Sequence, residues 1–171
     1  VKYQEAAYFT SDDCIWVGLY LPSVAEWDEQ GVTLEQECAW PAEHSTIRIA
    51  KGSGKFAMKL RIPYWATQGV KVMLNGEEVA ADYAPCSYVT IPARKWKKGD
   101  VVEVHLPFTK HINYGPDRMT TAATGPGETN TPFTPSWVGT LMYGPLAMGT
   151  TGINNWHDAT IVLDSNLDNV I

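Results

Sequence analysis

The feature that most limits how this chain can fold is an alternation of apolar and polar residues with a period of two. In the stretch 56–62 (FAMKLRI) every second residue is strongly apolar, and similar alternation recurs at 70–74 and 102–106. Successive side chains of a β-strand point to opposite faces of a sheet, so this pattern predicts strands with one face in a core and one in water. Further strand-like runs lie at 15–21, 32–38, 46–50, 87–91 and 137–143.

Turn-forming residues separate these runs. They occur at 51–54 (KGSG), 75–76 (NG) and 98–100 (KGD). Asn-Gly and Gly-rich pairs of this kind connect neighbouring strands of hairpins. Many short strands with little helical periodicity predict an all-β fold, namely an antiparallel β-sandwich of the jelly-roll or immunoglobulin-like type. At this length the chain is expected to form a single domain over residues 1–171.

Two segments depart from the simple pattern. The run 15–21 (IWVGLYL) is apolar on both faces, which predicts either a central position in its sheet or a second covering layer. The segment 113–135 contains no strand-like run, so we expect a long loop there. Loops longer than ~12–15 residues are usually functional or disordered, and the sequence leaves the choice between ligand contact, surface coverage and disorder open.

The distribution of charge and apolar residues bears on possible partners. The chain has 13 basic and 19 acidic residues, a net charge of -6, and its Lys and Arg residues are scattered along the sequence. Phosphate binding needs a clustered basic surface, so nucleic acid is not expected as a partner. No stretch approaches the ~20 apolar residues that span a bilayer, so a membrane partner is not expected either. The location in the cell is left open, with periplasm or secretion from a bacterium as candidates.

Motifs for the common enzyme chemistries do not stand out. Cys14, Cys38 and Cys86 are too far apart for a zinc motif and are expected to be buried free thiols. The sequence has no HExxH motif, nucleophile elbow, Walker loop or dinucleotide fingerprint. Glycoside hydrolysis normally takes two facing carboxylates, but most acidic residues here fall in turns or at outward strand positions, where solvated charges are expected. We therefore predict no catalytic residue, no metal ligand and no cofactor in this chain.

Aromatic residues provide the only candidate binding groups. A sugar-binding platform needs flat rings within reach of planar polar side chains. We therefore take four residues near the long segment and the C-terminal region as candidate carbohydrate-binding residues, with a structural role as the alternative: His111, Tyr114, Trp137 and Trp156. Trp65 and Trp96 each adjoin a turn that leads from an apolar strand, so these two are expected to close the ends of the core.

Several phrases, in the right order, resemble glycoside hydrolase family 127, which contains β-L-arabinofuranosidases. The similar segments are 8–23 (the family's "YF..D.LYVNLYIPS"), 56–65 ("F.L.LRIPSW"), 70–76 ("V.VNG"), 87–100 ("SYL.I.R.W..GD") and 141–146 ("MYGPL"). The resemblance covers about Tyr8 to Gly149.

The resemblance implies a bacterial exo-acting hydrolase of arabinose-containing plant-type glycans, of which this chain would be the C-terminal β-sandwich region. In that family the cysteine nucleophile, the zinc and the acid/base glutamate belong to an N-terminal α/α-barrel, whose motifs are absent here. None of Cys14, Cys38 and Cys86 lies in a matching motif. The expected partner is therefore the N-terminal catalytic domain of the same chain, with any zinc in that domain. The alternative is an autonomous carbohydrate-binding module for plant-type glycans.

Overall fold

The computed structural model describes residues 6–119 and 136–149, with the side chains of 6–114 and 139–149. The chain divides into two compact units between Phe108 and Thr109. We call the part before this division unit 1 and the part after it unit 2, and describe each by itself. The expectation of a single domain over 1–171 stays a prediction.

The described residues form strands and no α-helix, which confirms the predicted all-β class. Unit 1 contains a short 3-10 helix, η2 (Asp28–Gln30), and nine strands: β1 (Tyr8–Ser11), β2 (Cys14–Val17), β3 (Ser23–Trp27), β4 (Val32–Glu37), β5 (His44–Ile62), β6 (Lys71–Leu74), β7 (Glu77–Glu78), β8 (Ser87–Lys97) and β9 (Val101–His105). Unit 2 contains β10 (Lys110–Met119), β11 (Ser136–Tyr143) and β12 (Leu146–Ala147), which pair in that order.

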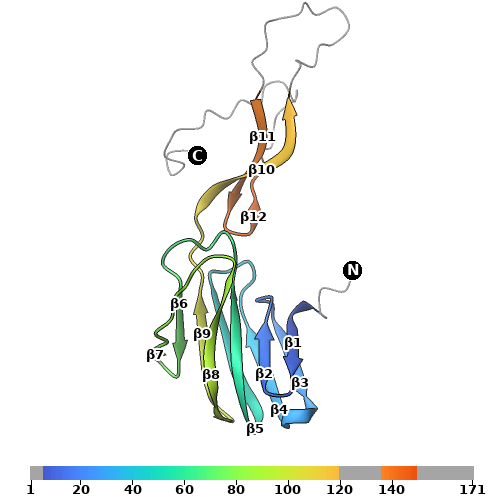
Figure 1. Cartoon of the computed structure of the whole chain (residues 1–171), viewed down its shortest axis with the longest axis vertical. Helices are drawn as coiled ribbons and strands as arrows, with labels where there is room; N and C mark the ends of the chain where they lie inside the picture. Colours follow the sequence, from blue (N-terminus) through green and yellow to red (C-terminus); the bar gives the residue numbers. More distant parts are fainter. Residues whose placement is uncertain (1–5, 120–135, 150–171) are drawn as a thin grey trace, which may run out of the picture. The chain divides into compact units, whose positions relative to one another are not determined.

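Strand β5 joins the two sheets of unit 1, because its two ends pair with different neighbours (Figure 1). Its first part lies between β4 and β9 in a sheet of order β3-β4-β5-β9-β6-β7, which we call sheet B. Its second part lies between β2 and β8 in a sheet of order β1-β2-β5-β8, which we call sheet A. Among the strands that the structure describes, all pairs are antiparallel except β2 with β5, so the expectation of a wholly antiparallel sandwich was wrong at this pair.

Gly52 lies where β5 passes from sheet B to sheet A. The sequence predicts a turn at 51–54, but β5 continues through all 19 residues. Gly52 has a φ of 78°, and a Cβ atom there would lie 1.9 Å from the carbonyl oxygen of Gly31. Only glycine tolerates both conditions, and the pairing register of β4 with β5 shifts beside it. The glycines of this stretch therefore bend a continuous strand instead of ending it.

The core of unit 1 is built from the apolar positions that the alternation predicts. On β5 the residues Phe56, Met58, Leu60 and Ile62 are each 0% exposed. Ile15 and Val17 on β2 contribute to the same cluster, together with Leu34, Ile47, Ile49, Val72, Val89, Ile91, Trp96, Val102 and Val104 from the other strands. Both sheets therefore bury one face in a common core, as expected for a sandwich.

Other local expectations are confirmed in part. Asn75 and Gly76 both have positive φ values and connect β6 to β7 as a two-residue hairpin turn. The run 15–21 lies centrally in sheet A, but its strand ends at Val17. Cys14 is buried and Cys38 half-buried, whereas Cys86 is exposed, so the expectation of buried thiols was wrong for Cys86, which lies in the turn before β8.

The prediction of a loop over 113–135 was wrong for residues 113–119. β10 extends to Met119 and pairs with β11, with a register irregularity between Tyr114 and Arg118. Residues of low strand propensity, among them Asn113, are part of this strand because their backbone pairs with β11, which the composition of the segment alone does not indicate. The part of this segment that falls at 120–135 lies outside the described residues.

Ser45 is a polar residue in the core whose replacement should stabilise unit 1. Its side chain is in phase with those of Ile47 and Ile49, it is 3% exposed, and its hydroxyl has no hydrogen-bond partner among the described residues. A buried hydroxyl without a partner costs free energy, so Ser45→Ala should raise the free energy of unfolding by about 1 kcal/mol.

Urea denaturation followed by circular dichroism measures this change. The matched control is Ser87→Ala, because the Ser87 hydroxyl donates a hydrogen bond to the carbonyl oxygen of Ala84 at 2.5 Å and its loss should destabilise. Equal destabilisation by both substitutions would show that the Ser45 hydroxyl has a partner.

Candidate functional site

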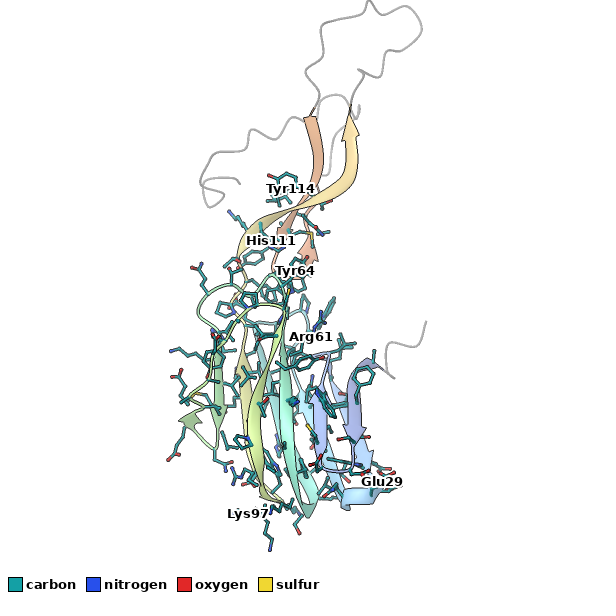
Figure 2. The ribbon with its side chains drawn as sticks, in the orientation of Figure 1. Glu29, Arg61, Tyr64, Lys97, His111 and Tyr114 are labelled. Carbon is teal, nitrogen blue, oxygen red and sulfur yellow. The ribbon has the colours of Figure 1, made fainter. Side chains whose placement is uncertain are left out.

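The structure describes the side chains of two predicted binding residues, His111 and Tyr114, both on β10 of unit 2 (Figure 2). His111 lies opposite Met142 and Tyr114 opposite Gly139. Residues three apart on a strand point to opposite faces, so these two side chains do not form one site. Tyr114 is 67% exposed, whereas His111 is half-buried with its Nδ1 atom 3.3 Å from the carbonyl oxygen of Thr109.

The structure does not describe the side chains of the other two predicted binding residues. Trp137 lies on β11 with its backbone opposite that of Arg118, and its side chain is outside the described part of the chain. Trp156 lies wholly outside the described residues. A carbohydrate site built from His111, Tyr114, Trp137 and Trp156 therefore stays a prediction, and His111 and Tyr114 would have to serve different faces of the β10–β11 ribbon.

The two tryptophans that were expected in the core do pack there. Trp96 is 0% exposed, stacks on Phe56 at 5.5 Å between ring centroids, and donates its indole N–H to the carbonyl oxygen of Phe56 at 2.8 Å. Trp65 is partly buried against the core and meets Phe108 edge to face at 5.4 Å. Neither ring is presented as a binding platform.

Asp100 is an acidic residue whose environment departs from the expected solvated surface. It is 2% exposed, and its carboxylate accepts hydrogen bonds from the Asn75 amide and the Lys97 backbone N–H, both at 3.0 Å. Arg94 lies 3.7 Å away. Burial opposes the charge, but these hydrogen bonds and the nearby cations hold the pKa of Asp100 below its ordinary value. This carboxylate fastens the β8–β9 turn and has no free face for chemistry.

The thiols of Cys14 and Cys38 are not activated. Burial raises the pKa of Cys14, and the nearby charge of Lys59 offsets this effect only in part. Burial also raises the pKa of Cys38. A cysteine nucleophile needs a lowered pKa, so neither thiol has the environment of a catalytic one.

Within the described ranges no group of three or more His, Cys, Asp and Glu side chains is placed to hold a metal ion. Among the described residues no helix is long and apolar enough to cross a membrane.

A cluster of cations on the outer face of sheet A is the most distinctive surface of unit 1. The paired segments of this sheet, 8–11, 14–17, 53–62 and 87–97, contain no Asp or Glu residue. They contain six of the 13 basic residues: Lys55, Lys59 and Arg61 on β5 and Arg94, Lys95 and Lys97 on β8. Residues scattered in the sequence are thus brought together by strand pairing.

Five of these six cations share the outer face. Lys55, Lys59 and Arg61 alternate with the buried residues of β5, so they point away from the core. Lys95 pairs with Lys55, and Lys97 pairs with Ser53. Directly paired residues lie on the same face of a sheet. Figure 2 shows Arg61 and Lys97 towards opposite ends of unit 1, so the cations follow the length of the strands.

Aromatic side chains lie among these cations. Trp16 pairs with Phe9 on β1 and with Lys59 on β5, and the Lys59 ammonium lies 5.2 Å from the centroid of the Trp16 ring. Tyr88 pairs with Arg61 and is 43% exposed. We call Trp16, Lys59, Arg61 and Tyr88, with Lys55, Lys95 and Lys97, the cationic aromatic face.

The outer face of sheet B carries both signs of charge, with Arg48 and Lys71 among its cations. Its strands carry Glu26, Glu35, Glu37 and Glu103 at positions that alternate with buried residues. Arg48 is paired with Glu37 at 3.1 Å. The two outer faces therefore differ, because the strands of sheet B hold acidic and basic residues, whereas those of sheet A hold cations without an acidic residue.

The sequence contains a partial signal for the cationic aromatic face. The alternation in 56–62 places Lys59 and Arg61 at outward positions, and 87–97 contains three cations without an acidic residue. The missing information was that these two segments pair with one another, which periodicity alone does not specify.

Comparison with known proteins agrees with the resemblance found in the sequence. Residues 14–108 match the family model described as "Beta-L-arabinofuranosidase, GH127 middle domain". The chain belongs to glycoside hydrolase family 127. The matched part is the middle domain, so the expected position in the C-terminal region of the enzyme was wrong. Similar phrases show which family a segment resembles, but they do not show where that segment lies within the longer enzyme. A comparison with curated protein sequences gives no match.

Solved structures of GH127 enzymes and a related protein share the fold. A GH127 β-arabinofuranosidase is 30% identical, with a TM-score of 0.62, over 82% of this chain and 23% of that chain. A glycoside hydrolase is 25% identical, with a TM-score of 0.60, over 82% and 22%. The GH127 β-L-arabinofuranosidase of Geobacillus stearothermophilus T6 is 24% identical and shows the fold alone, with a TM-score of 0.58 over 85% and 21%. The chain thus spans about a fifth of the length of these proteins.

Proposed function

We propose that this GH127 chain is a non-catalytic accessory domain of a bacterial glycoside hydrolase that acts on β-L-arabinofuranosides. In this proposal it packs on the N-terminal catalytic domain of the same enzyme and shapes the rim of the substrate site. The observation that carries the proposal is the match of residues 14–108 to a middle domain within much longer solved relatives. The raised pKa values of Cys14 and Cys38 support a domain that does not supply the nucleophile.

The open edge of the sandwich at β1 and β3 is the surface that we expect to meet the catalytic domain. Each of these strands has one neighbour among the described strands, and the Tyr8 hydroxyl joins the two edges through Ser23 at 3.0 Å. Val24 on β3 is 63% exposed and Phe9 on β1 is 53% exposed. Edge strands with exposed apolar side chains are usually covered in native proteins, and the large remainder of the enzyme would supply that cover.

Enzyme assays test the catalytic part of the proposal. The purified chain should release no more product from an aryl β-L-arabinofuranoside than a tag-only control, whereas the longer enzyme that contains it should hydrolyse this substrate. Turnover by the chain alone would contradict the accessory role.

Charge placed at the open edge tests the packing part. Val24→Lys should lower the melting temperature of the longer enzyme by several degrees and leave that of the isolated chain nearly unchanged, because a lysine at a covered edge is desolvated only in the enzyme. Glu77→Lys on β7, at the opposite edge of sheet B, is the matched control. Equal effects of both substitutions in the longer enzyme would contradict packing at β1 and β3.

A further inference from the structure

We propose that the cationic aromatic face of sheet A binds an acidic polysaccharide, with uronate carboxylates on its cations and sugar rings on its aromatic side chains. This inference concerns a second ligand of unit 1 and does not rest on the accessory role proposed above. It starts from the composition of this face: a chain with a net charge of -6 places five outward cations on one sheet face whose strands hold no acidic residue.

The cations of this face are available to a ligand. In the described part of the chain none of these five cations lies in an ion pair, whereas Arg48 on the other sheet is paired with Glu37. The Arg61 guanidinium donates one hydrogen bond, at 3.5 Å, to the carbonyl oxygen of Gly18 and keeps its other N–H groups for a ligand. Lys55 and Lys95 lie directly opposite one another. Like charges in this arrangement destabilise a sheet, and a bound polyanion would relieve that repulsion.

The spacing of the cations favours an extended ligand. Lys55, Lys59 and Arg61 lie on one face of β5, so at a rise of ~3.3 Å per residue they span at most roughly 20 Å along the strand. Trp16 lies beside Lys59, and Tyr88 lies beside Arg61. Each aromatic ring is therefore next to a cation, which suits a polymer that presents a ring face and a carboxylate in every residue.

The composition of this face distinguishes a hydrated glycan from a protein partner. Four of its five outward cations are lysines. Lysine is depleted from the buried centres of protein interfaces, since its strongly hydrated ammonium is costly to desolvate. A polysaccharide that stays solvated along one side leaves these ammonium groups in contact with water.

The ligand test compares an acidic oligosaccharide with its neutral form. Titration calorimetry of the whole chain with an α-1,4-linked oligogalacturonate is expected to show binding that weakens as salt rises, because exposed charges are screened. The fully methyl-esterified oligosaccharide keeps its rings and loses its charges, so it should bind at least ~10-fold more weakly.

Variants of the face test the location. The double substitution Lys59→Gln with Arg61→Gln should weaken binding about 10-fold, and Trp16→Ala or Tyr88→Ala should each weaken it about 3–10-fold. The double substitution Arg48→Gln with Lys71→Gln removes the same charge from sheet B and should leave the affinity unchanged. Circular dichroism shows whether each variant is folded, and Tyr88→Ala replaces Trp16→Ala if the latter is not.

Four results would overturn the proposal. They are the absence of oligogalacturonate binding at millimolar concentration, equal affinity for the methyl-esterified form, equal loss of affinity in the sheet B control, and equally tight binding of polyglutamate of similar charge. The last result would mean that the face recognises charge without recognising sugar rings.

Discussion

Trp96→Ala is expected to lower the free energy of unfolding of unit 1 by about 4 kcal/mol, in the range found when large aromatic side chains are removed from cores. Trp96 is 0% exposed and stacks on Phe56, which in turn meets Trp27 edge to face at 5.0 Å. The ring therefore links β8 to β5 and to the end of β3. Its loss would leave a cavity and would also remove the hydrogen bond from its indole N–H to the carbonyl oxygen of Phe56.

Far-UV circular dichroism during urea denaturation is the suitable measurement, because the substitution itself alters tryptophan fluorescence. Tyr88→Ala, at an exposed position of the same strand, is the control and should cost less than 1 kcal/mol. Trp96→Phe should have an intermediate effect, since it keeps most of the packing and loses the hydrogen bond. If Trp96→Ala cost no more than Tyr88→Ala, the central place of this ring in the core would be refuted.

Strand β5 shows how far local sequence determines this fold. The period-two alternation was sufficient to place Phe56, Met58, Leu60 and Ile62 in the core, because each strand of a sandwich buries one face. The Gly-rich stretch 51–54 was misjudged, because glycines serve both in turns and in strands that bend against a neighbouring backbone. Gly52 and Gly31 are 21 positions apart in the sequence, so no local pattern could reveal that their backbones lie close together.

The candidate binding residues were harder to predict for a related reason. His111 and Tyr114 were selected for their residue types and their nearness in sequence, yet a spacing of three places them on opposite faces of β10. Lys59, Lys95 and Trp16 come from three strands and meet only through pairing, one pair of which is parallel. Residue type indicates what a side chain can do, whereas strand register decides which side chains act together.

Asp100 departs most clearly from the expectation that acidic residues in turns are solvated. Its lowered pKa allows the contribution of its charge to stability to be tested. The sequence 98–100 predicts a turn, and Gly99 with a φ of 90° confirms it. This turn leads from β8 in sheet A to β9 in sheet B, which do not pair with one another. An acidic residue in such a turn is normally solvated. Here the side chain is turned inward, where Asn75 from the β6–β7 turn donates to one carboxylate oxygen and the Lys97 backbone N–H to the other. The backbone N–H of Val101 in turn donates to the Asn75 side-chain oxygen at 2.9 Å, so two turns are joined by one polar network.

Asp100→Asn is expected to lower the free energy of unfolding by about 2–3 kcal/mol at pH 7, because hydrogen bonds to a buried charged acceptor are lost. The pKa of Asp100 is lowered in the folded state, so its charge stabilises the fold above the ordinary pKa of about 3.9. This contribution is lost as the pH falls through the folded-state pKa. The difference in stability between the wild type and Asp100→Asn should therefore be constant from pH 7 to about pH 5 and then shrink with acidification.

Urea denaturation of both proteins from pH 7 to pH 2.5 measures this difference, and the other acidic groups cancel because both proteins contain them. Asn75→Gly keeps the positive φ of 51° accessible while removing the amide, so it provides the partner substitution. Combined with Asp100→Asn it should cost about 1 kcal/mol less than the sum of the single changes, since both remove the same hydrogen bond. Curves for wild type and Asp100→Asn that stay parallel down to pH 2.5 would mean that the buried carboxylate is not stabilised in its charged form.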